Sequence, residues 1–338
     1  GTFTYPLQNE DIVYGLGEQI RGINKRGWQY VSWNSDNPNH QEDTRSLYGA
    51  HNFILISGRQ TFGAFFDNPG RMEFDIGYTH GNLMQIRAEK NDLTVYIITG
   101  QDEKHIVKQF RQLIGRSYIP PLWAFGYGQS RWGYQNEQDM RQVAQQYQAA
   151  GIPLDSIYLD IDYMERYKDF TVDQERFPDL GKLVQDMRTQ GIRLVPIIDA
   201  GVKIETGYDV YQEGVAHNYF CKNAEGKDFV GAVWPGRVHF PDFLQPEARD
   251  WFGKKYAVLT DLGIEGFWND MNEPAIFYTE DRLAETCSEI QRLTAGNMGI
   301  DEYFAFTGMV AGLNGNKGDY DKFYHNVAGK MVKHSDVH

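Results

Sequence analysis

The first hundred residues carry short apolar or alternating runs that are separated by turn residues. The runs that read as strands are residues 12–14, 53–56, 61–66, 72–76 and 92–98. Turn sequences such as Asp67-Asn68-Pro69-Gly70 lie between them, and no helical repeat interrupts the series. Strands at this spacing without intervening helices predict an antiparallel β-sandwich.

The period of the apolar positions becomes helical just after residue 100. Apolar side chains recur at helical spacing at Ile106, Val107, Phe110 and Leu113. Asp102 stands where an N-cap is needed and Gly115 where a helix should stop, so we expect one helix after the last strand of the sandwich.

Beyond Pro121 the pattern alternates between apolar strands and amphipathic helices. The strand candidates are residues 123–129, 156–161, 194–198 and 266–269. The helix candidates are residues 137–150, 181–190 and 246–262. Alternating strands and helices of this kind predict a parallel sheet, in which active-site side chains lie at or just beyond the carboxyl ends of the strands.

Polar or aromatic residues follow each of these predicted strands. In chain order they are Gln129-Ser130-Arg131-Trp132, Asp160-Ile161-Asp162, Asp199 and Asp270. Because the carboxyl ends of parallel strands meet at one edge of a sheet, we expect an acidic site at this edge.

Charge and composition exclude several classes of protein. The 338 residues contain 33 basic and 46 acidic side chains, a net charge of -13, which disfavours binding to nucleic acid. No run approaches the roughly 20 apolar residues of a membrane helix, and residues 1–6 lack the pattern of a signal peptide. No Asn-x-Ser/Thr acceptor occurs, and we expect a soluble, cytoplasmic, bacterial protein.

The cysteines indicate neither a disulfide framework nor a zinc site. Cys221 and Cys287 are far apart and neither belongs to a C-x-x-C pair, so we interpret both as reduced thiols.

One segment carries a specific family signature. It reads Gly266-Phe267-Trp268-Asn269-Asp270-Met271-Asn272-Glu273-Pro274 and resembles the W-x-D-M-N-E-P motif around the nucleophile of the α-glucosidase branch of glycoside hydrolase family 31. Further segments occur in the family's order: Tyr14-Gly15-Leu16-Gly17-Glu18, Gly126-Tyr127-Gly128-Gln129-Ser130-Arg131, Asp160-Ile161-Asp162-Tyr163-Met164, Val233-Trp234-Pro235-Gly236 and Phe240-Pro241-Asp242-Phe243. The resemblance therefore covers essentially the whole chain.

The resemblance implies a retaining mechanism with Asp270 as the nucleophile. Such an enzyme needs one attacking carboxylate about 5 Å from a second carboxylic acid that protonates the leaving oxygen. Trp268 and Met271 would wall the sugar pocket, while Asn272 and Glu273 could orient the nucleophile by hydrogen bonds, so Glu273 joins Asp270 in the predicted catalytic set.

The resemblance also implies polar contacts to the sugar. Asp160 matches the residue that binds outer hydroxyl groups. We favour it over Asp162 because side chains alternate along a strand and because the first Asp of the motif is the ligand. Arg237 and His239 lie in the loop of Trp234, and we interpret both as solvated loop charges.

The remaining pocket residues are also carried over from the family. Ile161, Ile197 and Trp234 match residues around the bound glucose, and barrel core is the alternative for the two isoleucines. Trp132 could stack at the boundary with the leaving group, or could simply pack. Asp36 matches a sandwich loop that reaches over the pocket, and a turn-capping Asp before a proline is its alternative.

The expected architecture is a β-sandwich over residues 1–116, followed over residues 117–338 by the first part of a (β/α)8 TIM-type barrel with an insertion after strand 4. Only about four of the eight barrel strands are expected, and the family's acid/base Asp belongs to a later segment. The second half of the barrel must then come from a longer chain or from a separate one.

The expected reaction is exo-hydrolysis of terminal α-linked glucose from short oligosaccharides through a covalent glycosyl-enzyme. No metal or organic cofactor is implied, and the partners are the oligosaccharide, the downstream half of the barrel and, as an option, a second copy of the chain. The alternatives are an α-xylosidase, an α-transglucosylase, an α-glucan lyase or a non-catalytic sugar-binding subunit.

Overall fold

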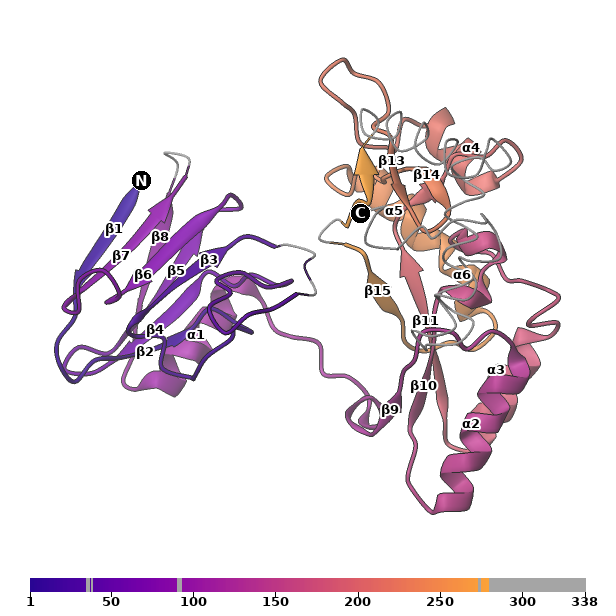
Figure 1. Cartoon of the computed structure of the whole chain (residues 1–338), viewed down its shortest axis with the longest axis horizontal. Coiled ribbons are helices and arrows are strands. Elements are labelled where there is room, and N and C mark those ends of the chain that lie inside the picture. Colours follow the sequence, from indigo (N-terminus) through magenta and orange to yellow (C-terminus); the bar gives the residue numbers. More distant parts are fainter. Residues whose placement is uncertain (35–36, 38, 90–92, 273–274, 280–338) are drawn as a thin grey trace, which may run out of the picture. The chain divides into compact units, whose positions relative to one another are not determined.

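The chain forms two compact units, Gly1–Ile119 and Pro120–His338 (Figure 1). The computed structural model describes residues 1–34, 37, 39–89, 93–272 and 275–279. Among these residues, no helix is both long and apolar enough to cross a membrane. The insertion predicted after strand 4, around residues 308–318, lies outside the described residues.

The first unit is a sandwich of two antiparallel sheets. One sheet has the order β1 (Thr2–Pro6), β7 (Leu83–Ala88), β6 (Met72–Ile76) and β3 (Trp28–Ser32). The other has the order β2 (Ile12–Gly15), β4 (Phe53–Ser57), β5 (Phe62–Asp67) and β8 (Thr94–Thr99). All pairings are antiparallel, which confirms the predicted sandwich. The sequence pattern missed β1, β3 and β7, which all belong to the first sheet.

The two sheets pack through a shared apolar core. Phe66 of β5 is fully buried, and its ring lies 5.4 Å from that of Phe3 and 5.7 Å from that of Phe74 on the opposite sheet. On the other face of the second sheet, helix α1 (Glu103–Ile114) stacks Phe110 on Phe53 at 4.0 Å. Asp102 caps this helix through the N–H of His105 at 2.7 Å, as predicted.

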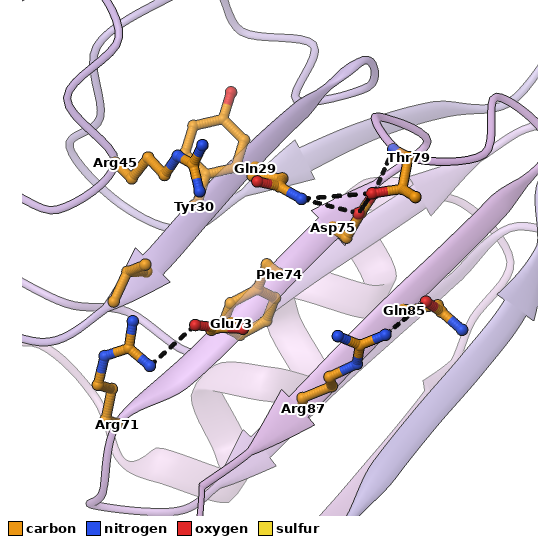
Figure 2. Close-up of a pocket in the computed structure, with 11 residues that line it drawn as sticks. Gln29, Tyr30, Arg45, Arg71, Glu73, Phe74, Asp75, Thr79, Gln85 and Arg87 are labelled. Carbon is orange, nitrogen blue, oxygen red and sulfur yellow. Dashed lines mark hydrogen bonds and ion pairs between the residues drawn. The ribbon is translucent and has the colours of Figure 1, made fainter.

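A polar hollow of about 280 Å³ lies on the outer face of the first sheet (Figure 2). Several of its polar groups bind one another: Arg71 pairs with Glu73 at 2.9 Å, and the Asp75 carboxylate accepts hydrogen bonds from Gln29 and Thr79. Burial would raise the pKa of Asp75, but these hydrogen bonds together with two backbone N–H groups outweigh burial and lower it. The hollow belongs to the sandwich and contains none of the predicted site residues.

The second unit contains a four-stranded parallel sheet whose strands follow chain order. These are β9 (Gly128–Gln129), β10 (Ser156–Leu159), β11 (Arg193–Asp199) and β15 (Trp268–Asp270). The α-helices between them are α2 (Glu137–Ala150), α3 (Leu180–Thr189), α4 (Asp209–Ala216), α5 (Pro246–Lys255) and α6 (Ala257–Thr260) (Figure 1). The arrangement confirms the predicted first part of a (β/α) barrel.

Two predicted elements differ from the structure. The segment expected to begin the first barrel strand is instead a 3-10 helix, η1 (Leu122–Phe125), and strand pairing starts only at Gly128. The helix predicted over residues 246–262 breaks at Tyr256, which caps both α5 and α6. The ring of Tyr256 packs against Phe170 and Phe267, at 5.2 and 4.8 Å, so tertiary packing accompanies the break.

The connection from β11 to β15 contributes three strands to a small antiparallel sheet that the sequence pattern did not reveal, and the fourth strand follows β15. Its order is β12 (Val202–Lys203), β14 (Gly236–His239), β13 (Gly231–Val233) and β16 (Tyr278–Thr279). Helix α4 (Asp209–Ala216) lies between β12 and β13 in the chain. The turn between β13 and β14 carries Trp234, so this sheet presents that side chain just after the carboxyl end of β11.

Candidate active site

Acidic residues lie at the carboxyl ends of three adjacent parallel strands. Asp270 ends β15 and is paired in register with Asp199, the last residue of β11, while Asp160 directly follows β10. Two steps earlier in the register, Ile197 pairs with Trp268. Parallel register therefore brings together Asp160, Asp199 and Asp270, which the sequence had placed up to 110 positions apart in the chain.

Asp160 is held in an environment that resists its ionisation. Its side chain is 9% exposed, and its Oδ1 accepts the N–H of Ile161 at 2.7 Å at the start of the 3-10 helix η2 (Ile161–Tyr163). Burial raises the pKa of Asp160 to about 6; the Ile161 N–H opposes that shift, and the carboxylates of Asp162 and Asp270 reinforce it. Asp270 is thus close enough to Asp160 for the two carboxyl groups to affect each other's ionisation.

Asp162 is buried and engaged in an ion pair. It is 1% exposed and pairs with Arg176 at 3.2 Å. Burial raises its pKa to about 6 despite this ion pair. The alternation argument for preferring Asp160 was wrong, because β10 ends at Leu159 and because residues 160 and 162 would share a face of any strand. The preference for Asp160 over Asp162 as the sugar ligand therefore rests on the motif and on the ion pair that Asp162 forms with Arg176.

Indole rings from separate segments lie close to one another near the strand ends. Trp132 follows β9 and is 38% exposed, and its ring lies 5.4 Å from that of Trp234. Trp234 in turn meets Phe277 edge-on at 5.1 Å, and Trp268 meets Tyr158 at 6.1 Å. Aromatic faces of this kind are those on which sugar rings stack.

Ile161 and Ile197 are almost completely buried, at 2% and 1% exposure, within the main apolar cluster of the unit. This burial agrees with the alternative in which they form barrel core. Both residues also lie directly beside the acidic strand ends.

The backbone is strained immediately after the candidate nucleophile. Met271 has a φ of 59°, which is rare for a residue other than glycine, and its carbonyl accepts the N–H of Ala275 at 3.1 Å. Asn272 is exposed. Glu273 and Asp36 lie outside the described residues, so their predicted roles remain predictions.

The two basic residues near Trp234 differ from each other. Arg237 is exposed, as expected, but it lies within strand β14, where it pairs with Ala232 of β13, and not in a loop. For His239 the interpretation as a solvated loop charge was wrong: the side chain is 7% exposed, and its Nδ1 lies 2.8 Å from the carbonyl oxygen of Phe229. It is buried because β14 packs it against the ring of Phe220 at 5.2 Å.

One buried carboxyl group near the strand ends was not anticipated from the sequence. Asp169 is completely buried, and its Oδ1 accepts the backbone N–H of Asp199 at 3.1 Å. Asp199 had been noted as a strand-ending residue, whereas no pattern distinguished Asp169. The only available signal was a pair of charged residues between two aromatic ones, in Tyr167-Lys168-Asp169-Phe170.

Comparison with known proteins agrees with this geometry. Residues 117–338 match the glycosyl hydrolases family 31 TIM-barrel domain, and residues 2–75 match the glycosyl hydrolase 31 N-terminal galactose mutarotase-like domain. The chain belongs to glycosyl hydrolase family 31, and the resemblance inferred from the sequence is confirmed.

Its relatives include curated α-glucosidases. The chain is 44% identical over 273 residues to Alpha-glucosidase 2 of Bacillus thermoamyloliquefaciens, a match that covers 80% of this chain and 35% of that protein. It is 28% identical over 332 residues to an alpha-glucosidase of Saccharolobus solfataricus, covering 98% of this chain and 45% of the relative. The chain thus spans less than half the length of these relatives.

A solved structure shares the fold over nearly the whole chain. The GH31 dextranase of Flavobacterium johnsoniae complexed with glucose superposes with a TM-score of 0.76 at 29% identity, covering 96% of this chain and 39% of the dextranase. The sandwich and the partial barrel therefore both belong to this family's architecture.

Proposed function

We propose that the protein is a retaining, exo-acting α-glucosidase that releases terminal α-linked glucose from short oligosaccharides. The observation that carries the proposal is the placement of Asp270, within its W-N-D-M-N-E-P motif, at the end of β15 beside Asp199 and Asp160. The α-glucosidases among its relatives support this choice of substrate class.

In the proposed reaction the Asp270 carboxylate attacks the anomeric carbon of the terminal glucose. The bond between this carbon and the leaving oxygen breaks while a second carboxylic acid donates its proton to that oxygen. Water then attacks the glycosyl-enzyme ester, and the same second group removes the proton of the water, so the configuration is retained and Asp270 is regenerated.

The side chains around Asp270 provide binding and orientation in this proposal. Asp160, once ionised, accepts hydrogen bonds from outer hydroxyl groups of the glucose. Trp132, Trp234 and Trp268 supply apolar faces for the sugar ring and the leaving group. The second carboxylic acid is proposed to come from a segment downstream of this sequence, about 5 Å from Asp270.

A second candidate substrate follows from the structural match. The similar Flavobacterium johnsoniae enzyme is a dextranase, and a mutant of it was solved with isomaltotriose. An isomalto-oligosaccharide is therefore the alternative to a malto-oligosaccharide as the preferred substrate.

Product analysis with the full-length protein tests the proposed function. Maltose, isomaltose, nigerose, xylosyl-glucose and nitrophenyl α-glycosides are supplied in turn, and the anomer formed first is followed by proton NMR. We expect glucose released as the α-anomer. Initial β-anomer would contradict retention, and release of xylose or of an unsaturated product would assign another family activity.

Replacing Asp160 by Ala is expected to weaken binding of a glucose-shaped iminosugar by about ten- to a hundredfold, because a charge-assisted hydrogen bond worth about 1.5–3 kcal/mol is lost. The inhibition constant of the full-length protein is the measurement. Asp261→Ala, which removes an exposed carboxylate after α6, is the matched control. An unchanged constant for Asp160→Ala would move the assignment to Asp162.

Binding of a neutral glucose analogue is expected to weaken on acidification through the raised pKa of Asp160. That pKa is about 6. The accepting carboxylate is therefore mostly present at pH 7 and falls to about one tenth at pH 5, which raises the dissociation constant about tenfold. Calorimetric titration at both values, with Asp160→Asn as control, measures the change. A wild-type constant as flat with pH as that of Asp160→Asn would refute the assignment.

A further inference from the structure

The loop after β10 contains an unusual concentration of strained backbone. Arg166, Tyr167 and Phe170 have φ angles of 51°, 61° and 60°, in a region that residues with a Cβ rarely adopt. Such strain persists only where the surrounding contacts over-determine it, and it clusters at functional sites.

Packing and ion pairs hold this loop in place. Lys168 is 7% exposed at its side chain and lies 3.3 Å from Glu165 and 3.0 Å from Glu205. The ring of Phe170 packs edge-on against Phe252 at 4.9 Å. The loop is therefore anchored on both sides of the residue between Lys168 and Phe170, which is Asp169.

The anchored loop places the carboxyl group of Asp169 at the end of β11. Its Oδ1 accepts the backbone N–H of Asp199 at 3.1 Å, and its own carbonyl oxygen accepts the hydroxyl of Tyr208 at 2.7 Å. Tyr163 adds a second tie to the same strand end by donating to the carbonyl oxygen of Ile197 at 2.8 Å. Because Asp199 is in register with Asp270, these contacts hold the strand that positions the nucleophile.

The surroundings of Asp169 favour its protonated form. It is fully buried, and among the described residues its Oδ2 accepts no hydrogen bond. Burial and then the Asp199 carboxyl raise its pKa well above the usual range, although the N–H of Asp199 lowers it. The titratable groups that face it are Asp199 of β11, Tyr163 of η2, Tyr208 at the start of α4 and Tyr256 after α5.

We propose that Asp169 is a positioning residue for the nucleophile: in protonated form it holds the N–H of Asp199 and thereby fixes the end of β11 against Asp270. The inference rests on the proposed function, because it takes Asp270 as the attacking group. Oδ1 is the acceptor and Oδ2 carries the proton. A neutral carboxyl group satisfies the strand end without adding a second negative charge beside the site.

The full-length protein with Asp169→Asn and Asp169→Ala tests the proposal. Asn keeps the acceptor oxygen and the neutrality, so it should react with a 5-fluoroglucosyl fluoride trap within about threefold of wild type, whereas Ala should react at least about thirtyfold more slowly. We expect the loss in kcat, with an iminosugar inhibition constant changed by less than about threefold. Ala at the wild-type rate, or Asn as slow as Ala, would overturn the positioning role.

A stability measurement keeps the test decisive if Asp169→Ala fails to fold. A raised folded-state pKa means that wild-type stability from this group is complete below the unfolded pKa and is lost as pH rises toward the folded pKa. Asp169→Asn removes that loss, so its Tm relative to wild type should increase as pH rises above about 4, the ordinary pKa of an aspartate. A difference that does not change with pH would show that Asp169 ionises normally and would overturn the proposal.

The outcomes separate this inference from the proposed function. If the trap labels wild type at a residue other than Asp270, the proposed nucleophile and the positioning role fail together. If wild type is labelled at Asp270 and Asp169→Ala is labelled equally fast, the nucleophile stands and only the positioning role fails.

Discussion

Asp270→Asn in the full-length protein is expected to lower turnover by roughly 10⁴-fold or more while leaving the fold intact, as removal of a covalent nucleophile does in other enzymes. An amide cannot attack the anomeric carbon, nor can it stabilise the positive charge that develops there. Initial rates on a nitrophenyl α-glucoside measure the loss, and the far-UV circular dichroism and Tm confirm the fold.

The control for this variant is the same substitution, Asp to Asn, at a position away from the site. Asp261→Asn also removes one carboxylate, but at an exposed position after α6. It should retain wild-type turnover. Turnover of Asp270→Asn within about tenfold of wild type would exclude Asp270 as the nucleophile.

The 338-residue chain expressed alone is expected to show no useful hydrolysis of α-glucosides. The proposed proton donor lies downstream, and loss of general acid catalysis usually costs about 10²- to 10⁴-fold. A pocket with one wall missing would also leave the sugar open to water and unable to be distorted. Glucose release by the chain, compared with that by the full-length protein at equal concentration, is the measurement.

Adding the missing part should restore activity. The downstream segment is supplied in the same chain or in trans, and a segment whose acidic residues near the site are replaced by their amides serves as the control. Robust glucose release by the 338 residues alone would show that an acid within this sequence protonates the leaving oxygen, and the proposed location of the second carboxyl group would be wrong.

The parts of the fold that local pattern determines were predictable. Helix α2 spans Glu137–Ala150, as its amphipathic period indicated, and Gly151 ends it with a φ of 67°. Strands β3 and β7 were missed, although in β7 the buried Met84, Ile86 and Ala88 alternate with Gln85 and Arg87, which is the pattern of a half-buried strand. The small sheet that carries Trp234 was missed because strands of two to four residues have too few positions for a recognisable period.

The candidate site likewise contains residues that the sequence pattern indicated and one that it did not. Asp160, Asp199 and Asp270 could be predicted because each lies at the end of a strand, and parallel strands align their carboxyl ends. Asp169 could not be predicted from the sequence, because its burial depends on packing between its loop and Phe252, more than eighty residues away in sequence. Contacts of that range follow from tertiary structure and leave no periodic trace in the chain.

The central claim is that Asp270 forms the covalent bond to the sugar. The most direct measurement is to inactivate the full-length protein with a 5-fluoroglucosyl fluoride, digest it and sequence the modified peptide by mass spectrometry. The account predicts a single glycosyl adduct on Asp270, within the peptide that contains Trp268-Asn269-Asp270-Met271, and no adduct in Asp270→Asn. An adduct on any other carboxylate, or an equal adduct in Asp270→Asn, would contradict it.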